Sequence, residues 1–378
     1  MARSVYSLLS LAIAVLFLAS NSAVCEVRAF TAARSSAVLP NSSAWQQTSA
    51  RRKNNEGRKT VEAIPPGGSF QKARELIRRN AWPIGTDPKG VSPDYPLTIT
   101  RIAVTVGACY LTWFAQGQYS NVLASSAVTL ICSMVFDRRL GQAAFCGSFA
   151  GMCSTAVIPT KNLALILGLS AALSYEILIH AFNAFLGVGG RLGLTAFLAT
   201  SAVAFKTGVK TGLARYSIAG GSKALALSAL CWKKTLLPWA MWHAIGSVAT
   251  IVLREVSDDS AAADPVRASA VVGLAAALLL QDKTAALAVY GGSFTGMSLP
   301  SKLMSMDATS RSFNITNVIS LLLTFAVAGA FGGIVHGATI DWKLWAGGWG
   351  GKAGFCAFLG CMAYRVATGT LGSIRRSD

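Results

Sequence analysis

Glu176 and His180 are the residues whose types and spacing best suit proton transfer. They lie four positions apart in an apolar run, so a helix would place them on one face. An ionisable group at the centre of a membrane span costs about 2.5–3.5 kcal/mol on insertion scales, so it marks a functional residue by default. Two interpretations are open: the pair passes protons, or Glu176 caps a neighbouring helix or pairs with an arginine or lysine from a loop. His336 is the related candidate for ion coupling in the second half of the chain.

A short glycine motif occurs twice. GSFAGM at Gly147–Met152 recurs as GSFTGM at Gly292–Met297, each copy ten residues after an aspartate, Asp137 or Asp282. Two glycines four apart allow helices to pack closely, which is one interpretation. The other is that both segments are broken near mid-membrane and line a solute path. The candidates for that path are Gly147, Ser148, Phe149, Gly151, Gly292, Ser293, Phe294 and Gly296.

A second motif, GG[RK]xGxxAFL, begins at Gly189 and again at Gly350. Its glycines permit positive φ and expose backbone N–H groups where a helix starts. A cation follows in each copy, Arg191 or Lys352, and the combination favours an anion site. The alternative is that each cation anchors a helix end among lipid headgroups.

The composition places these motifs in a membrane protein. Of 378 residues, 53% are hydrophobic and only 13% are charged, about half the charged fraction of a soluble domain. The net charge of +18 is spread over the N-terminal region and the breaks between apolar runs, which is typical of loops beside membrane spans and not of a nucleic-acid-binding surface. Eight cysteines without a CxxC pair and three histidines predict neither a metal site nor a disulfide framework, and no cofactor is expected.

Apolar runs alternate with short polar breaks from residue 98 onward, and each run predicts a membrane helix. The ten runs are 98–116, 120–136, 140–158, 162–186, 191–208, 237–253, 266–281, 284–302, 313–338 and 350–368. A further segment, 217–232, could be interfacial, re-entrant or spanning.

The two motifs recur in the same order, which predicts an internal duplication. We therefore expect an all-α polytopic membrane protein of about ten transmembrane helices, with membrane repeats at 98–208 and 237–370 and a basic connecting segment at 209–236. Five helices per repeat give the second repeat inverted topology, whereas a span at 217–232 would make the repeats parallel. This plan, with a glycine motif in each half, resembles the urea-transporter architecture, but no signature of that family matches residue by residue.

The N-terminal region is predicted to be a targeting sequence. Residues 1–29 have the layout of a signal peptide, and residues 30–61 have transit-peptide composition. The junction Val27-Arg28-Ala29-Phe30 resembles the two-part presequences of algae with secondary plastids, which implies a plastid membrane. The alternative is a secretory-pathway endomembrane. Residues 62–96 are expected to form a soluble preamble with a short amphipathic helix at Gln71–Asn80.

These features predict a transporter or channel that moves a small solute or anion across an organellar bilayer. In one form of this prediction, transport is coupled to protons. The alternative is a non-transporting scaffold or assembly factor of a plastid membrane complex. Enzyme signatures such as HExxH, GxSxG or a P-loop are missing from the sequence, so we do not expect an enzyme. In a transporter the two GSFxGM segments should meet beside a polar cavity that contains Glu176, whereas a scaffold should be a solid bundle.

Overall fold

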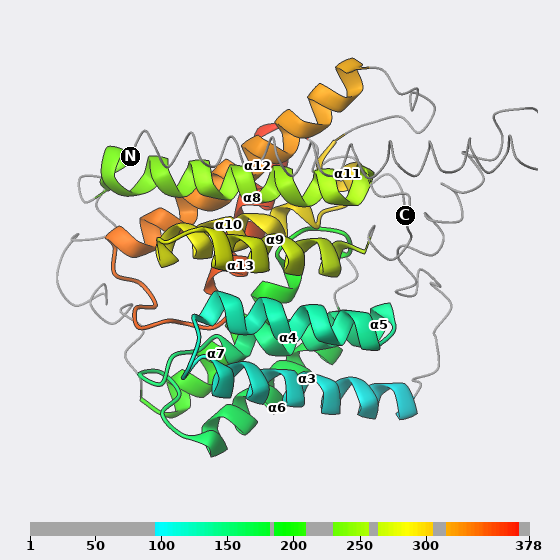
Figure 1. Cartoon of the computed structure of the whole chain (residues 1–378), viewed down its shortest axis with the longest axis vertical. Coiled ribbons are helices and arrows are strands. Elements are labelled where there is room, and N and C mark those ends of the chain that lie inside the picture. The colour runs from blue at the N-terminus through cyan, green and yellow to red at the C-terminus, as the bar shows by residue number, and fades with distance from the viewer. Residues whose placement is uncertain (1–94, 182–184, 209–229, 257–263, 305–314, 370–378) are drawn as a thin grey trace, which may run out of the picture. The chain divides into compact units, whose positions relative to one another are not determined.

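The computed structural model describes residues 95–181, 185–208, 230–256, 264–304 and 315–369 (Figure 1). Every regular element within these ranges is helical, as the sequence predicts. The predicted presequence, nearly all of the predicted preamble, and most of the ambiguous segment at 217–232 lie outside the described residues.

Five helices form the first part of the described chain. They are α3 (Tyr95–Ala115), α4 (Asn121–Val135), α5 (Arg138–Gly151), α6 (Lys161–Ala181) and α7 (Arg191–Lys206). Side-chain caps explain where two of them begin: the Ser120 hydroxyl accepts a hydrogen bond from the Leu123 N–H at the start of α4, and the Asp137 carboxylate accepts one from the Leu140 N–H at the start of α5.

The second part follows a similar order. It contains a π-helical turn η4 (Trp232–Leu236), α8 (Leu237–Val256), α9 (Pro265–Leu279), α10 (Lys283–Gly296), the single turn α11 (Pro300–Leu303), α12 (Ile315–Asp341) and α13 (Lys352–Ala367). Asp264 caps α9, which has proline at its first position, and Asp282 caps α10.

Helix length separates these elements into two groups. Four helices are long and apolar enough to cross a membrane: α3, α6, the continuous η4–α8 segment, and α12. The helices α4, α5, α7, α9, α10 and α13 have only 14–16 residues, or about 21–24 Å at 1.5 Å per residue, which is short of the ~30 Å hydrocarbon layer. A helix thus overlaps each predicted run, although some helices, such as α3 and α12, extend beyond it. Length and composition support four spans and not ten.

The long helices carry apolar side chains on their outer faces. On α6, Ile166, Leu169, Leu173 and Ile177 are exposed at helical spacing. The same holds on α12, where Ile319, Leu323 and Val327 follow one another at every fourth position. Exposed apolar stripes of this kind are suited to contact with lipid tails.

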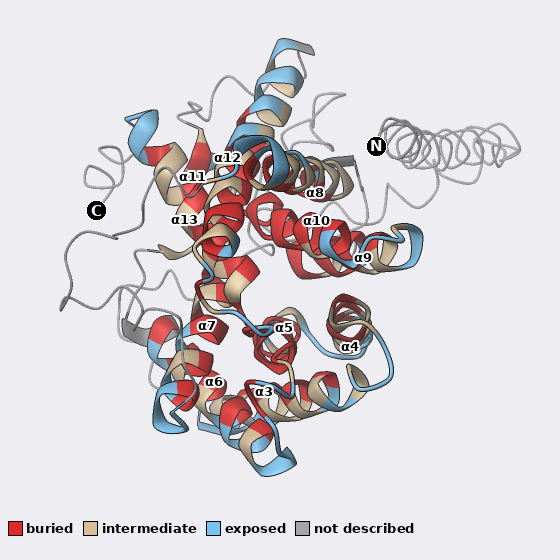
Figure 2. Cartoon of the chain, turned by 90° about the vertical axis from the view of Figure 1, so that its left-hand side faces the viewer, coloured by how far each residue is buried: buried red, intermediate tan, exposed pale blue. Residues whose placement is uncertain are grey.

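By contrast, α5 and α10 are almost wholly buried (Figure 2). Each packs along a long helix, α5 against α3 and α10 against α8. Both stop at the second glycine of the GSFxGM motif, with Met152 and Met297 as the C-caps. The run predicted at 140–158 is therefore a short helix followed by a non-helical segment in which Val157 and Ile158 are buried.

Candidate functional site

The two GSFxGM motifs meet through their aromatic residues. The ring centroids of Phe149 and Phe294 are 4.1 Å apart in an edge-on arrangement, and Phe145 stacks on Phe294 at 5.1 Å. Tyr290 completes the group, with its ring 5.3 Å from that of Phe149. We call these four residues, all fully buried, the aromatic cluster. Edge-on and offset contacts of this kind stabilise beyond the area that they bury.

The motif glycines serve close packing. A Cβ added to Gly147 would overlap the backbone of Thr105 on α3, and one added to Gly292 would overlap the backbone of His243 on α8. The Ser148 hydroxyl lies 2.7 Å from that of Thr129. Ser293 forms the matching 2.7 Å contact with Ser269. The glycines and serines of both motifs thus join helices, and only the aromatic residues of the path candidates reach a cavity.

Hydrogen bonds from backbone N–H groups connect each GG[RK]xG motif to the opposite part of the chain. The Gly189 N–H donates to the Ser298 hydroxyl at 2.8 Å, and the Gly350 N–H donates to the Cys153 sulfur at 3.0 Å. A second pair of bonds follows: the Leu299 N–H donates to the Gly187 carbonyl, and the Ser154 N–H to the Gly348 carbonyl. The segment after each GSFxGM motif is therefore fixed by the segment before the other GG[RK]xG motif.

A cavity of about 870 Å³ opens beside the aromatic cluster. Its lining includes Phe149 and Met152 of the first GSFxGM motif. The rest comes from the starts of α4, α8 and α10, the end of α12, the loop after it and the start of α13: Asn121, Trp239, Lys283, Thr284, Leu287, His336, Thr339, Ile340, residues 343–349, Lys352 and Ala353. This size suits a small organic ligand, for which pockets commonly measure ~300–1,000 Å³.

A second pocket, of only about 40 Å³, has a parallel lining. Phe294 and Met297 of the other GSFxGM motif face it, together with Arg191 at the start of α7. Tyr175 and Gln142 also line it. The two pockets thus repeat the same combination of motif elements at very different volumes.

Arg191 and Lys352 follow glycine N-caps of the same unusual conformation. Gly190 and Gly351 have φ of 79° and 76°, which favours glycine. The Arg191 guanidinium is buried and donates to the Leu178 carbonyl at 2.7 Å. The Lys352 ammonium donates to the Leu344 carbonyl at 2.9 Å and lines the larger cavity. The anion interpretation therefore fits Lys352 better than Arg191.

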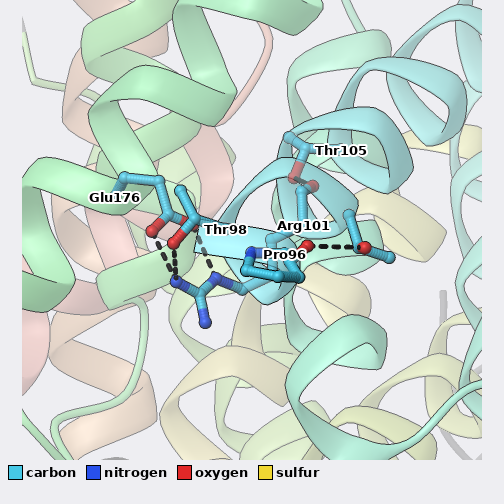
Figure 3. A network of polar contacts seen from close by, with 6 residues as sticks. Pro96, Thr98, Arg101, Thr105 and Glu176 are labelled. Carbon is cyan, nitrogen blue, oxygen red and sulfur yellow. Dashed lines mark hydrogen bonds and ion pairs between the residues drawn. The ribbon is translucent and has the colours of Figure 1, made fainter. Parts of the chain in front are cut away.

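Glu176 lies in an ion pair with Arg101 of α3 (Figure 3). The Arg101 Nε and Nη2 atoms each donate to a carboxylate oxygen at 2.6 Å, and Nη2 also donates to the Thr98 hydroxyl. Glu176 lines neither cavity, contrary to the expectation for a transporter. It pairs with a basic side chain, as the alternative interpretation expects, but that side chain belongs to α3 and not to a loop. His180 belongs to α6, and its side chain is outside the described part of the chain.

His336 is paired with a second histidine. Its Nδ1 lies 3.1 Å from Nε2 of His243, and its ring lies 4.1 Å from the Trp239 ring. Both histidines are buried, and His336 lines the larger cavity. The predicted ion-coupling candidates therefore differ in position: His336 lines the larger cavity and Glu176 lines neither cavity.

The ends of α5 and α10 are capped by two side chains, one from the turn directly after α3 and one from α8. The Gln116 amide donates to the carbonyls of Gly151 and Cys153. Arg254 donates from Nη1 to the carbonyls of Gly296 and Ser298, both at 2.8 Å. A guanidinium at a helix C-terminus is favourable because the exposed carbonyls carry partial negative charge.

We expect Arg254→Gln to be tolerated and Arg254→Met to destabilise the protein by about 1–3 kcal/mol. Glutamine retains donors of the kind that Gln116 uses, whereas methionine leaves buried carbonyls unpaired. Thermal unfolding of the purified protein measures the difference. Equal melting temperatures for the two variants would contradict the capping role.

The sequence analysis did not identify several residues that line the larger cavity. Trp239, Trp345, Trp349, Lys283 and Lys343 lie outside both motifs, and no periodicity distinguishes them. Arg101 had a usable signal, since it is a charged residue inside a predicted apolar run. A lone charge there requires a partner, and Glu176 was the acid that could provide it.

Comparison with known proteins supplies no relative. No protein family matches the chain, and no curated protein or solved structure is significantly similar to it. Functional assignment therefore depends on the geometry described above.

Proposed function

We propose that this chain is an integral membrane transporter of small solutes, composed of two five-helix halves of opposite orientation. The solute passes between the two pockets at the interface of the halves, and the aromatic cluster separates them. The membrane assignment agrees with the four long apolar helices. A plastid membrane is the proposed location, because residues 1–61 have the composition of a two-part presequence.

Matched contacts support the duplication. Asp137 and Asp282 cap α5 and α10, whereas Gln116 and Arg254 cap the carbonyl ends of the same helices. The long helices α6 and α12 also make matched contacts. A Cβ on Gly168 of α6 would meet Val106 and Cys109, and one on Gly329 of α12 would meet Ala244 and Ser247 at the same spacing. Tyr175 and His336 each follow seven residues later and line the two pockets.

The contact between α4 and α9 supports opposite orientation. Arg267, in the first turn of α9, donates to the carbonyl of Ser133, in the last turn of α4. The two helices pack extensively and therefore run antiparallel. Antiparallel packing of matched helices is expected of an inverted repeat, in which the two copies enter the membrane from opposite sides.

The unequal volumes of the two pockets carry the transport proposal. Two pockets with parallel linings, one of about 870 Å³ and one of about 40 Å³, are what a two-fold structure gives when one side is open and the other closed. Exchange of the two arrangements would open the smaller pocket, which is the alternating access that inverted repeats allow. A scaffold has no need of such a pair. In this proposal Glu176 positions α3 against α6 and does not transfer protons.

The experiment measures flux into vesicles before and after the cavity mouth is blocked. Thr284 lines the larger cavity and is exposed, so Thr284→Cys in a Cys231→Ser background introduces a thiol where a bulky membrane-impermeant thiol reagent fits. We expect saturable uptake of at least one member of a panel of urea, phosphate, chloride and 2-naphthoate, and at least a tenfold loss after modification.

The matched control is Thr160→Cys in the same background, because Thr160 is exposed and lines neither pocket. Its modification should leave uptake unchanged. Uptake no faster than in protein-free vesicles for the whole panel would contradict transport and favour the scaffold.

A further inference from the structure

We propose that the larger cavity binds a small organic anion with a flat apolar body. That this anion is also the permeant depends on the proposed function, whereas the binding site itself does not. Three observations support the site: the charge of the lining, the end of α13 that enters it, and the aromatic walls.

The charged residues of the lining are all cationic. Lys283, Lys343 and Lys352 contribute three ammonium groups, and no aspartate or glutamate is among the described residues that line the cavity. The nearest acids in sequence are engaged elsewhere: Asp282 caps α10, and Asp341 accepts a hydrogen bond from the Cys231 N–H. Ammonium groups around a partly enclosed space attract an anion more strongly than they would in open water.

Lys352 is the best placed of the three cations. Lys283 and Lys343 are exposed, whereas Lys352 is only partly so. Its bond to the Leu344 carbonyl uses one of three ammonium donors, and the others remain available to a ligand. Lys352 and Ala353 form the first turn of α13, whose N-cap Gly351 has no side chain to accept from the helix N–H groups. The positive end of a helix and a fixed cation thus coincide in the cavity.

The other walls suit an aromatic or flat apolar ligand. Trp239, Trp345 and Trp349 line the cavity, and the buried Trp349 Nε1 has no hydrogen-bond partner within the described structure. Lys343 and Trp345 also adopt positive φ, 53° and 50°, a conformation that costs energy for residues with a side chain and that clusters at binding sites.

Comparison of the two pockets shows that the ligand site belongs to the larger one. In the smaller pocket Val188 occupies the place of Trp349, directly before the glycine pair, so this aromatic wall is missing there. Its volume of about 40 Å³ holds little more than a water molecule, so in this structure only the larger cavity admits an organic anion.

The test is equilibrium binding of 2-naphthoate to the full-length chain in phosphatidylcholine nanodiscs, by calorimetry against empty nanodiscs. The uncharged 2-naphthamide and inorganic phosphate serve as the other probes. Of the three probes, we expect only 2-naphthoate to bind saturably. Lys352→Gln should weaken it about tenfold to hundredfold, the range of a lost charge-assisted hydrogen bond, and Lys352→Arg should restore most of the affinity. The matched control Lys161→Gln removes an exposed cation that lines neither pocket and should have no effect.

Each alternative has its own outcome. Binding of 2-naphthamide as tight as that of 2-naphthoate, or an unchanged affinity in Lys352→Gln, overturns the anion site. Equal binding of phosphate overturns the requirement for a flat body. Displacement of 2-naphthoate by phosphatidylglycerol in the nanodisc assigns the lysines to lipid headgroups and also overturns the proposal. Binding without flux rejects only the proposed transport, and flux of other solutes without 2-naphthoate binding rejects only this inference.

Discussion

Glu176→Gln is expected to lower the free energy of unfolding by about 3–5 kcal/mol, because the Arg101 guanidinium would remain buried without its carboxylate partner. The two side chains are 10% and 11% exposed, and both Arg101–Glu176 hydrogen bonds are 2.6 Å long. The pair joins α3 to α6 across 75 positions of sequence. The loss corresponds to a fall in melting temperature of roughly 6–20 °C for a domain of this size.

Two variants separate the ion pair from other causes. Arg101→Met combined with Glu176→Met removes both charges and should recover most of the lost stability, since replacing a whole buried pair by apolar groups is often neutral. Glu255→Gln makes the same change at an exposed position of α8 and should have little effect. A normal melting temperature for Glu176→Gln together with loss of pH-dependent flux would instead assign the carboxyl group to proton transfer.

The positions of the helices could be predicted because each depends on local sequence. Apolar runs bounded by Ser120, Asp137, Asp264 and Asp282 locate the starts of α4, α5, α9 and α10. Their ends could not be predicted as well. The residues after Gly151 are as apolar as those before it, so hydropathy continues through a point at which the hydrogen-bonded helix stops. The Gln116 amide, which lies 35 positions away in sequence, caps the last carbonyl of the helix, that of Gly151, and hydropathy does not reveal this contact.

Partners between distant helices could not be predicted for the same physical reason. His243 and His336 are 93 positions apart, and their contact depends on how α8 packs along α12. The repeated motifs suggested that Phe149 and Phe294 would meet, and these rings do lie together. Repetition could not indicate that the two pockets differ in volume, because a pocket's volume depends on how the helices around it pack, which matched motifs do not specify.

The crossing of α7 and α13 is the second position where we expect a large effect. Gly193 and Gly354 face each other so closely that a Cβ on either would overlap the other residue's Cα. Gly193→Ala and Gly354→Ala should therefore each force the helices apart and cost about 1–3 kcal/mol. The double variant should cost less than the sum, because the first methyl group has already opened the space that the second one needs.

A thermal-unfolding double-mutant cycle measures this coupling, with Gly107→Ala as the matched control. Gly107 lies on α3 with nothing within 4 Å of an added Cβ, so alanine there should be neutral or stabilising by up to ~1 kcal/mol. Since α7 and α13 begin at the cations that line the two pockets, separating them should also weaken 2-naphthoate binding in the folded fraction. Strictly additive losses, or single variants as stable as the Gly107 control, would contradict a direct contact between the two glycines and with it the close junction on which the proposed two-fold arrangement depends.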